Sequence, residues 1–135
     1  MYGKIYQSAD VLKKALDGIW LRNKAISNNI TNVNTPGYKR ITVEFEDSLR
    51  QAIEKNSGKL KTTDKNHIQG MNFDNYYTPR IIQDKNFSYR FDGNNVDIDT
   101  EIGDLAKNYI MYEALIKQIS DEYEKIKNVI SEGSK

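Results

Sequence analysis

Apolar residues recur every seven positions near the N-terminus, in two rows that are offset by four residues. One row is Ile5, Leu12, Ile19, Ile26 and Val33, and the other is Ala9, Leu16, Asn23 and Ile30. Rows with offsets of three and four lie on one face of an α-helix. The pattern therefore predicts a helix from about Ile5 to about Asn29. Asn23 is the single polar member of the stripe. Gly18 weakens the predicted helix because glycine has a low helix propensity.

The last third of the chain repeats this pattern over residues 98–130. One row is Ile102, Tyr109, Ile116, Tyr123 and Ile130, and the other is Ile98, Leu105, Tyr112, Ile119 and Ile126. No polar residue interrupts either row. The segment predicts a second long helix, with Asp99 or Thr100 as its N-cap and Gly133 at its end.

Each predicted helix has a single apolar stripe, and pairing the two helices would let the stripes cover each other. We therefore expect a mainly α fold in which the terminal helices form an antiparallel coiled coil. The predicted interface consists of Ile5, Leu12, Leu16, Ile19, Ile26, Ile30, Ile102, Leu105, Tyr109, Tyr112, Ile116, Ile119, Tyr123 and Ile126. The chain then divides into a helix with an Asn-rich segment at 1–35, an irregular middle at 36–97 and a helix at 98–135.

The middle of the chain begins with a helix-breaking segment. Pro36 disfavours a helical conformation at Thr35, and the Pro-Gly pair favours a turn. Further on, residues 43–55 place Phe45 and Leu49 at helical spacing and predict a short helix. Residues 56–80 are polar and are predicted to be mostly loop.

A small β-hairpin is predicted at residues 86–98. Phe87, Tyr89 and Phe91 alternate with polar residues there, and Val96 and Ile98 resume the alternation. The intervening Asp-Gly-Asn-Asn at 92–95 has the composition of a turn.

Composition and charge exclude several classes of function. The chain has 135 residues, enough for one domain, and its net charge of +1 provides no field that would attract nucleic acid. It contains no cysteine, which excludes disulfides and thiol chemistry. Charged residues interrupt the N-terminus before any apolar run forms, so we expect no cleaved signal peptide, and no stretch has the length of a membrane span.

No catalytic, cofactor or metal site can be drawn from the residues. His67 is the only histidine and lies in the predicted loop, so no catalytic triad is evident. A calcium loop beginning at Asp97 fails because Ile102 stands where glycine is needed and Asn108 where glutamate is needed. The glycines are scattered and form no phosphate-binding loop. We therefore expect a protein that is not an enzyme.

Residues 28–40 carry the most specific motif. They read Asn-Asn-Ile-Thr-Asn-Val-Asn-Thr-Pro-Gly-Tyr-Lys-Arg, which resembles the N-terminal signature of flagellar rod and hook proteins. The matching residues are Asn28, Asn29, Ile30, Asn32, Asn34, Thr35, Pro36, Gly37, Tyr38, Lys39 and Arg40. Ser27 and Thr31 stand where alanine is common. Asparagine side chains can bond backbone groups at a helix end, which suits a helix that stops before a Pro-Gly turn.

Two features narrow the resemblance to the short proximal rod proteins. Distal rod and hook proteins are much longer than this chain. In addition, Asp-Gly-Asn-Asn-Val-Asp-Ile-Asp at 92–99 resembles the approach to the final helix in one group of proximal rod proteins, with Ile98 as the one departure.

The resemblance implies a structural subunit of the flagellar basal body that polymerises through its terminal helices and serves motility. It implies export through the flagellar type III gate and assembly in the extracytoplasmic rod. The implied partners are other rod proteins, further copies of the chain, the membrane ring and the rod-base adaptor FliE. Early export substrates of this family carry a phenylalanine four residues before a second apolar residue, which Phe45 and Leu49 match. The alternative is that both residues pack inside the subunit.

Two other classes of function stay open at this point. A non-axial coiled-coil adaptor or export chaperone would form a discrete oligomer and would have no use for the Asn-Thr-Pro-Gly turn. An enzyme of another kind would need a pocket with perturbed carboxylates, for which Asp97 and Asp99 are the candidates.

Overall fold

The computed structural model describes residues 2–57, 77–85, 88 and 90–133. It contains three helices, α1 (Tyr2–Thr31), α2 (Glu46–Ser57) and α3 (Ile98–Glu132), and two strands, β1 (Ile41–Glu44) and β2 (Arg80–Gln83). The predicted mainly α fold with long terminal helices and a short middle helix is confirmed. None of the helices in the described part is long and apolar enough to cross a membrane.

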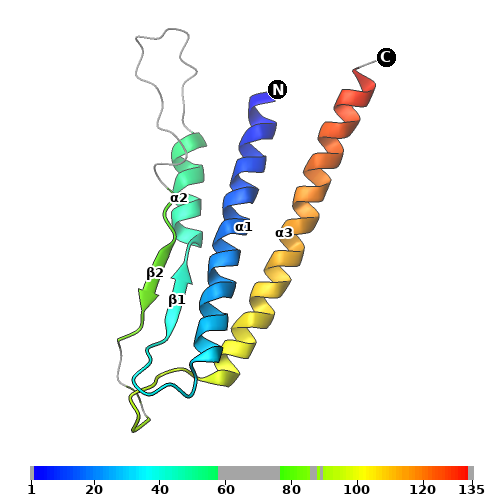
Figure 1. Cartoon of the computed structure of the whole chain (residues 1–135). Helices are drawn as coiled ribbons and strands as arrows, with labels where there is room; N and C mark the ends of the chain where they lie inside the picture. Colours follow the sequence, from blue (N-terminus) through cyan, green and yellow to red (C-terminus); the bar gives the residue numbers. More distant parts are fainter. Residues whose placement is uncertain (1, 58–76, 86–87, 89, 134–135) are drawn as a thin grey trace.

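The long helices run antiparallel, with the start of α1 and the end of α3 at the same end of the molecule (Figure 1). On its other side α1 contacts β1 and α2, so it is the central element of the fold. The two strands pair antiparallel, with Val43 opposite Ile81. Figure 1 also shows α3 diverging from α1 towards its C-terminal end.

The buried apolar side chains come mainly from α1 and the segment that follows it. They are Ala15, Ile19, Ala25, Ile26, Val43, Phe45, Ala52 and Val96. The buried residues of α3 are both polar, Glu101 and Asn108. The apolar core of the described residues therefore lies where α1 meets β1 and α2, and α3 packs onto α1 from outside it.

Gly18 allows the closest approach in this core. A Cβ atom at this position would lie 2.4 Å from the ring of Phe45, which is 2% exposed. The Arg22 guanidinium lies 4.6 Å from the centre of the same ring and donates hydrogen bonds of 3.1 and 3.0 Å to the Val43 carbonyl. Gly18 thus lowers helix propensity but leaves room for the Phe45 ring against α1.

The sequence placed the antiparallel strands in the wrong segment. No strand occurs at residue 88 or at 90–97, and the paired strands are Ile41–Glu44 and Arg80–Gln83. Residues 90–97 instead bond to the segment after α1: Gly37 N–H donates to the Asp92 carbonyl at 2.7 Å. Phe87 and Tyr89, on which the hairpin prediction also rested, lie outside the described residues, as do residues 58–76 of the predicted loop and His67.

The N-cap of α3 differs from the prediction, whereas its C-cap agrees with it. The N-cap is Asp97, not Asp99 or Thr100. Its carboxylate accepts hydrogen bonds from the backbone of Asp99 at 3.2 Å and from the Thr100 hydroxyl at 2.7 Å. Both residues predicted as caps therefore lie within the first turn. Gly133 is the C-cap, as predicted, and donates to the Val129 carbonyl at 3.0 Å.

Replacing Gly18 with alanine is expected to destabilise the subunit by about 1–3 kcal/mol, because the added methyl group overlaps the Phe45 ring. Gly103→Ala is the matched control: it lies in α3 with no atom within 4 Å of the added Cβ. There alanine should stabilise by about 0.5–1 kcal/mol through helix propensity. Urea unfolding followed by circular dichroism measures both. Equal effects of the two substitutions would contradict the packing argument.

Candidate functional site

The Asn-rich motif folds against the residues that precede α3, and we call this contact region, residues 28–41 with 90–101, the motif junction. Asn29 lies at its centre and is completely buried. Its amide donates to the Ile41 carbonyl at 2.8 Å and to Glu101 at 3.1 Å. Its side-chain oxygen accepts from the Ile41 backbone at 2.9 Å and from the Tyr38 hydroxyl at 3.2 Å. One side chain therefore joins the end of α1 to the start of β1 and to α3.

The rest of the motif closes the end of α1. The Asn32 amide donates to the Asn28 carbonyl at 2.8 Å, and the Thr35 hydroxyl donates to the Asn32 side chain at 3.1 Å. Gly37 has a φ of 71°, a left-handed conformation that favours glycine. Asn28, Asn34, Thr35, Pro36 and Gly37 are exposed, whereas Ile30 and Tyr38 are half-buried.

Asn94 joins the segment at residues 92–99 to the Asn-rich motif at residues 28–40. It is completely buried, and its amide lies 2.9, 3.0 and 2.9 Å from the carbonyl oxygens of Asn32, Val33 and Thr35. Its side-chain oxygen accepts from the Val96 backbone at 2.8 Å. These three carbonyls belong to residues that follow α1, so Asn94 holds the turn after the helix through its side-chain amide. Next to it, the Asn95 side chain accepts from the Arg40 backbone at 2.7 Å.

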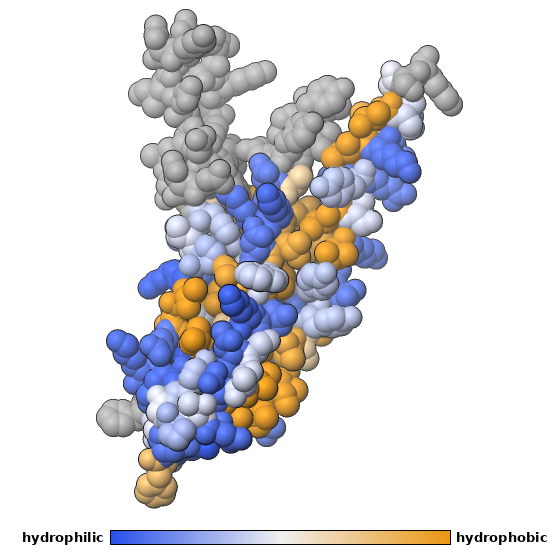
Figure 2. Space-filling view, in the orientation of Figure 1, coloured by the Kyte–Doolittle hydropathy of each residue, from blue (hydrophilic) through white to orange (hydrophobic). Residues whose placement is uncertain are grey.

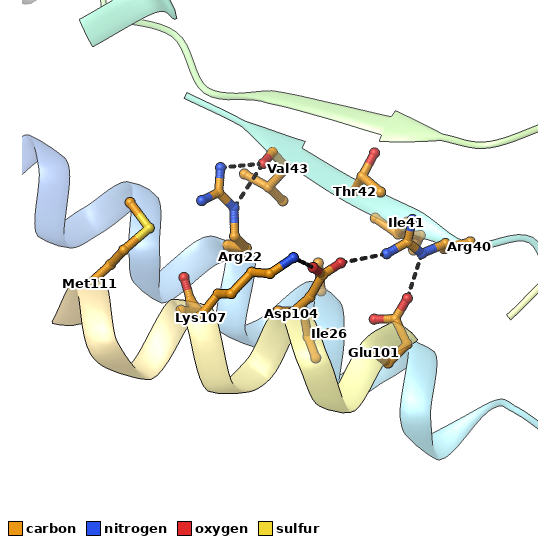
Figure 3. A pocket seen from close by; sticks show the side chains of 12 residues that line it. Arg22, Ile26, Arg40, Ile41, Thr42, Val43, Glu101, Asp104, Lys107 and Met111 are labelled. Carbon is orange, nitrogen blue, oxygen red and sulfur yellow. Dashed lines mark hydrogen bonds and ion pairs between the residues drawn. The ribbon is translucent and has the colours of Figure 1, made fainter. Parts of the chain in front are cut away.

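A buried carboxylate holds α3 to the junction. Glu101 has no solvent exposure, and it accepts hydrogen bonds from the Asn29 amide and the Arg40 guanidinium. Arg40 also pairs with Asp104 at 2.8 Å. Figure 3 shows Arg40 reaching from the segment before β1 to Glu101 and Asp104 of α3, beside a cavity of about 280 Å³.

The charges of this cluster support one another. Partial burial opposes the charge on Arg40, but its bonds to Glu101 and Asp104 outweigh that cost and raise the pKa of the guanidinium. Burial and the nearby Glu101 charge raise the pKa of Tyr38. A buried carboxylate is tolerated only when it is paired and hydrogen-bonded, and here both conditions are met.

The polar side chains at the centre of the junction therefore form hydrogen bonds and ion pairs with one another. No group of three or more metal-ligating side chains occurs among the described residues. Asp97, one of the carboxylates considered for catalysis, has a pKa lowered by its hydrogen bonds to Thr100 and Asp99, as an N-cap requires. The arrangement fixes how α1, β1 and α3 meet.

The predicted helix-pairing residues are divided between two grooves and the core. Leu12, Leu16, Ile119, Tyr123 and Ile126 line one groove between α1 and α3, of about 270 Å³. Leu16, Ile19, Ile102, Leu105, Tyr109 and Tyr112 line a second groove, of about 1010 Å³. Ile26 is buried, and it lines the cavity of Figure 3 together with Ile41 and Val43. Ile116 lines neither groove, and nothing is described of the Ile5 side chain.

The two apolar rows of α3 differ in exposure. Every member of the row Ile102, Tyr109, Ile116, Tyr123 and Ile130 is 39–66% exposed. In the other row Leu105, Ile119 and Ile126 are half-buried, while Ile98 and Tyr112 are exposed. Figure 2 shows apolar surface along the α3 flank of the molecule. Pairing with α1 therefore covers only one side of the α3 stripe.

The export-gate candidates lie in the subunit interior. Phe45 is buried between Gly18 and Arg22, and Leu49 is half-buried in the first turns of α2. The Leu49 backbone donates to the Phe45 carbonyl at 2.9 Å, as their helical spacing predicts. In the folded subunit Phe45 is not accessible at the surface.

Sequence analysis missed several residues on which the junction depends. The apolar rows of the last helix assign no role to Glu101, and the turn composition of residues 92–95 assigns Asn94 only to a turn. Both bond to partners about 60–70 residues away in the chain. Neither apolar periodicity nor local turn composition carries such a signal. Only the resemblance of residues 92–99 to a rod-protein segment pointed to that region.

Comparison with known proteins agrees with this structural role. A family model described as flagella basal body rod protein matches residues 22–39. The flagellar basal body rod protein FlgB of Bacillus subtilis is 36% identical over 124 residues, covering 90% of this chain and 92% of the relative. FlgB of Borreliella burgdorferi is 33% identical over 129 residues, covering 92% and 95%. FlgB of Escherichia coli is 26% identical over 124 residues, covering 84% and 85%.

These similarities extend over nearly the whole chain and define a structural protein of the bacterial flagellum. The chain belongs to the FlgB family of flagellar basal body rod proteins. It is a structural subunit of the rod, and it assembles there with other rod proteins. The alternative of a non-axial adaptor or export chaperone is not favoured.

Replacing Arg40 with methionine is expected to destabilise the subunit by roughly 3–5 kcal/mol, because it leaves the buried Glu101 carboxylate without its cation. Lys39→Met removes the same charge one residue away and should change stability by less than about 1 kcal/mol. The double variant Arg40→Met with Glu101→Leu should recover part of the loss. Denaturant unfolding compares the three, and equal losses for Arg40→Met and Lys39→Met would contradict the assignment.

Proposed function

We propose that the subunit polymerises into the rod through the apolar stripes of α1 and α3 and that it acts as structure only. It uses no cofactor and acts on no nucleic acid or small-molecule substrate. The terminal segments 1–35 and 98–135 form the assembling part of the chain, and residues 36–97 hold them in place. The exposed row of α3, which consists of Ile102, Tyr109, Ile116, Tyr123 and Ile130 and which we call the outer row, is the observation that carries this proposal.

The outer row gives a physical reason to assemble. It places large apolar side chains along one line of α3, with Tyr109 62% exposed. Burying a side chain of this size is worth about 1.5–3 kcal/mol. An aligned row of such residues exceeds the isolated apolar side chains that ordinary surfaces carry. Contact with a neighbouring subunit covers the row. Where the neighbour is another rod protein, that protein provides an equivalent apolar surface.

The subunit reaches its site by export. It passes unfolded through the flagellar type III gate without a cleaved signal peptide and joins the extracytoplasmic rod beside the membrane ring and FliE. Phe45 and Leu49 are the segment that the gate recognises. Because the folded subunit covers Phe45, recognition precedes folding.

Tyr109→Lys tests assembly. Placing a charge in the outer row should abolish rod formation and motility, whereas the monomer should lose less than about 1 kcal/mol because this side chain is mostly exposed. Gln118→Lys adds the same charge to an exposed position of α3 outside both rows. Basal bodies from cells that carry each variant are examined by electron microscopy. Normal rods with Tyr109→Lys would refute the proposed interface.

Phe45→Ala tests export. Phe45 is part of the core, so the variant loses stability. Val43→Ala, a smaller truncation in the same buried region, is the control for that loss. Secretion is measured in cells whose rod cannot assemble beyond this subunit. We expect secretion to fall several-fold with Phe45→Ala and to persist with Val43→Ala. Parallel behaviour of the two variants would assign Phe45 to packing only.

A further inference from the structure

Polar residues occupy the most buried positions of α3. Glu101 and Asn108 are the buried residues of this helix, at 0% and 3% exposure. Leu115 is half-buried, and the side chain of Glu122 is 19% exposed. These four residues stand seven apart, so they share one face of the helix, and we call them the inner row. Each of them directly precedes a member of the outer row, whose side chains are 39–65% exposed over the same stretch.

An open groove separates the outer row from α1. It is the larger groove, of about 1010 Å³, with Ile102 and Tyr109 on its α3 side and Leu16, Ile19 and Trp20 on its α1 side. Trp20 and Tyr109 are each 62% exposed. Apolar side chains of both helices therefore face the same open space. Apolar burial by itself would close this groove, because closure removes both walls from water.

A rotation of α3 about its own axis would bring the outer row against α1. Successive residues of an α-helix are about 100° apart, so a rotation by that angle exchanges the inner row for the outer row. The half-buried apolar row lies between the two and would stay covered. The rotation would bury large apolar side chains in place of Glu101, Asn108, Leu115 and Glu122. Apolar burial does not select the observed packing, so polar contacts must hold it.

Two hydrogen bonds to α1 oppose this rotation. The Asn29 amide donates to Glu101 at 3.1 Å, and the Asn108 amide donates to the Ile19 carbonyl at 3.1 Å. The first bond belongs to the motif junction and fixes the start of α3. Asn108 lies about two turns further along, before α3 diverges from α1 towards its C-terminal end (Figure 1). It is the last buried residue of α3 in the described part of the chain.

Asn108 lowers the stability of the subunit while it holds this position. Its side-chain oxygen, Oδ1, is buried and accepts no hydrogen bond from the described residues. A buried acceptor without a donor is unfavourable. A polar residue at a helix-pairing position can nevertheless specify how two helices meet, at the expense of stability. Stability alone would favour an apolar residue here, so the bond to Ile19 points to a role in specificity.

We propose that Asn108 sets the rotation of α3 on α1 and thereby keeps the outer row on the surface. Glu101 fixes the start of the helix, and Asn108 extends the same rotation beyond the motif junction. Asn108 is thus a positioning residue for the surface through which the subunit assembles. The inference rests on the proposed assembly through the outer row, but the rotation itself can be measured on the purified chain.

Cysteine labelling of the purified full chain measures the rotation, because the chain has no cysteine of its own. Tyr109→Cys reports on the outer row and Leu115→Cys on the inner row, in separate preparations. Asn108→Ala is added to each, because it removes the amide without placing a large apolar side chain in the inner row. We expect maleimide labelling to slow several-fold at position 109 and to accelerate several-fold at position 115. Opposite changes identify a rotation, which a general loosening of α3 would not produce.

Two further variants complete the test. Asn128→Ala removes an exposed asparagine of the same helix and should leave both labelling rates unchanged. Asn108→Leu fills the space of the amide, so that α3 stays packed, and should slow labelling at position 109 because the bond to Ile19 is lost. Acceleration at both positions with both Asn108 variants would assign Asn108 to packing only. That result, or unchanged rates at both positions, would overturn the proposal.

The two proposals fail in different ways. If Tyr109→Lys leaves rods intact while the labelling rates change as expected, Asn108 sets the rotation and the outer row is not the assembly surface. If Tyr109→Lys abolishes rods while Asn108→Ala leaves the labelling rates unchanged, assembly through the outer row stands and the role of Asn108 is wrong.

Discussion

The pairing of Glu101 with Arg40 and Asn29 is the interaction on which the arrangement of this subunit depends. A carboxylate without solvent exposure is tolerated only if a cation and hydrogen-bond donors surround it. Here the donor is Asn29 in the last turns of α1, and the cation is Arg40 in the segment that follows α1. The start of α3 must therefore meet the end of α1 in one register. Together with the Asn108 amide, which donates to the Ile19 carbonyl at 3.1 Å, this contact fixes how α3 packs on α1.

The Asn-rich motif is explained by the same requirement. Asn29 and Asn94 are both completely buried. Asn29 bonds both backbone groups of Ile41 at the start of β1, and Asn94 bonds carbonyls of the turn that follows α1. An amide can donate and accept at once, which neither a carboxylate nor an ammonium group can do. The buried asparagines of the two signature segments thus supply the hydrogen bonds where α1, β1 and α3 meet.

The two long helices differ in how much apolar surface they bury, because the core lies on the side of α1 that faces β1 and α2. Phe45 packs on Gly18 and fills the side of α1 that faces β1 and α2, so the subunit has a core that does not depend on α3's outer row. The long C-terminal helix is left with one covered and one uncovered row. A subunit built this way can fold around α1 and still offer an apolar surface to a neighbouring subunit, as the proposed assembly requires.

Periodicity along the chain by itself determined the two long helices, their apolar stripes, the break at Pro36 and the short helix after it, because helical spacing and turn chemistry are local properties. The tertiary structure decided which strands pair, that Asp97 and not Asp99 caps α3, that Gly18 serves packing, and that Glu101 is buried. Each of these depends on a partner from elsewhere in the chain or on which of several adjacent polar residues leaves the helical conformation. Bonds between residues as far apart as Asn29 and Glu101 leave no repeat in the sequence, so only the folded chain reveals them.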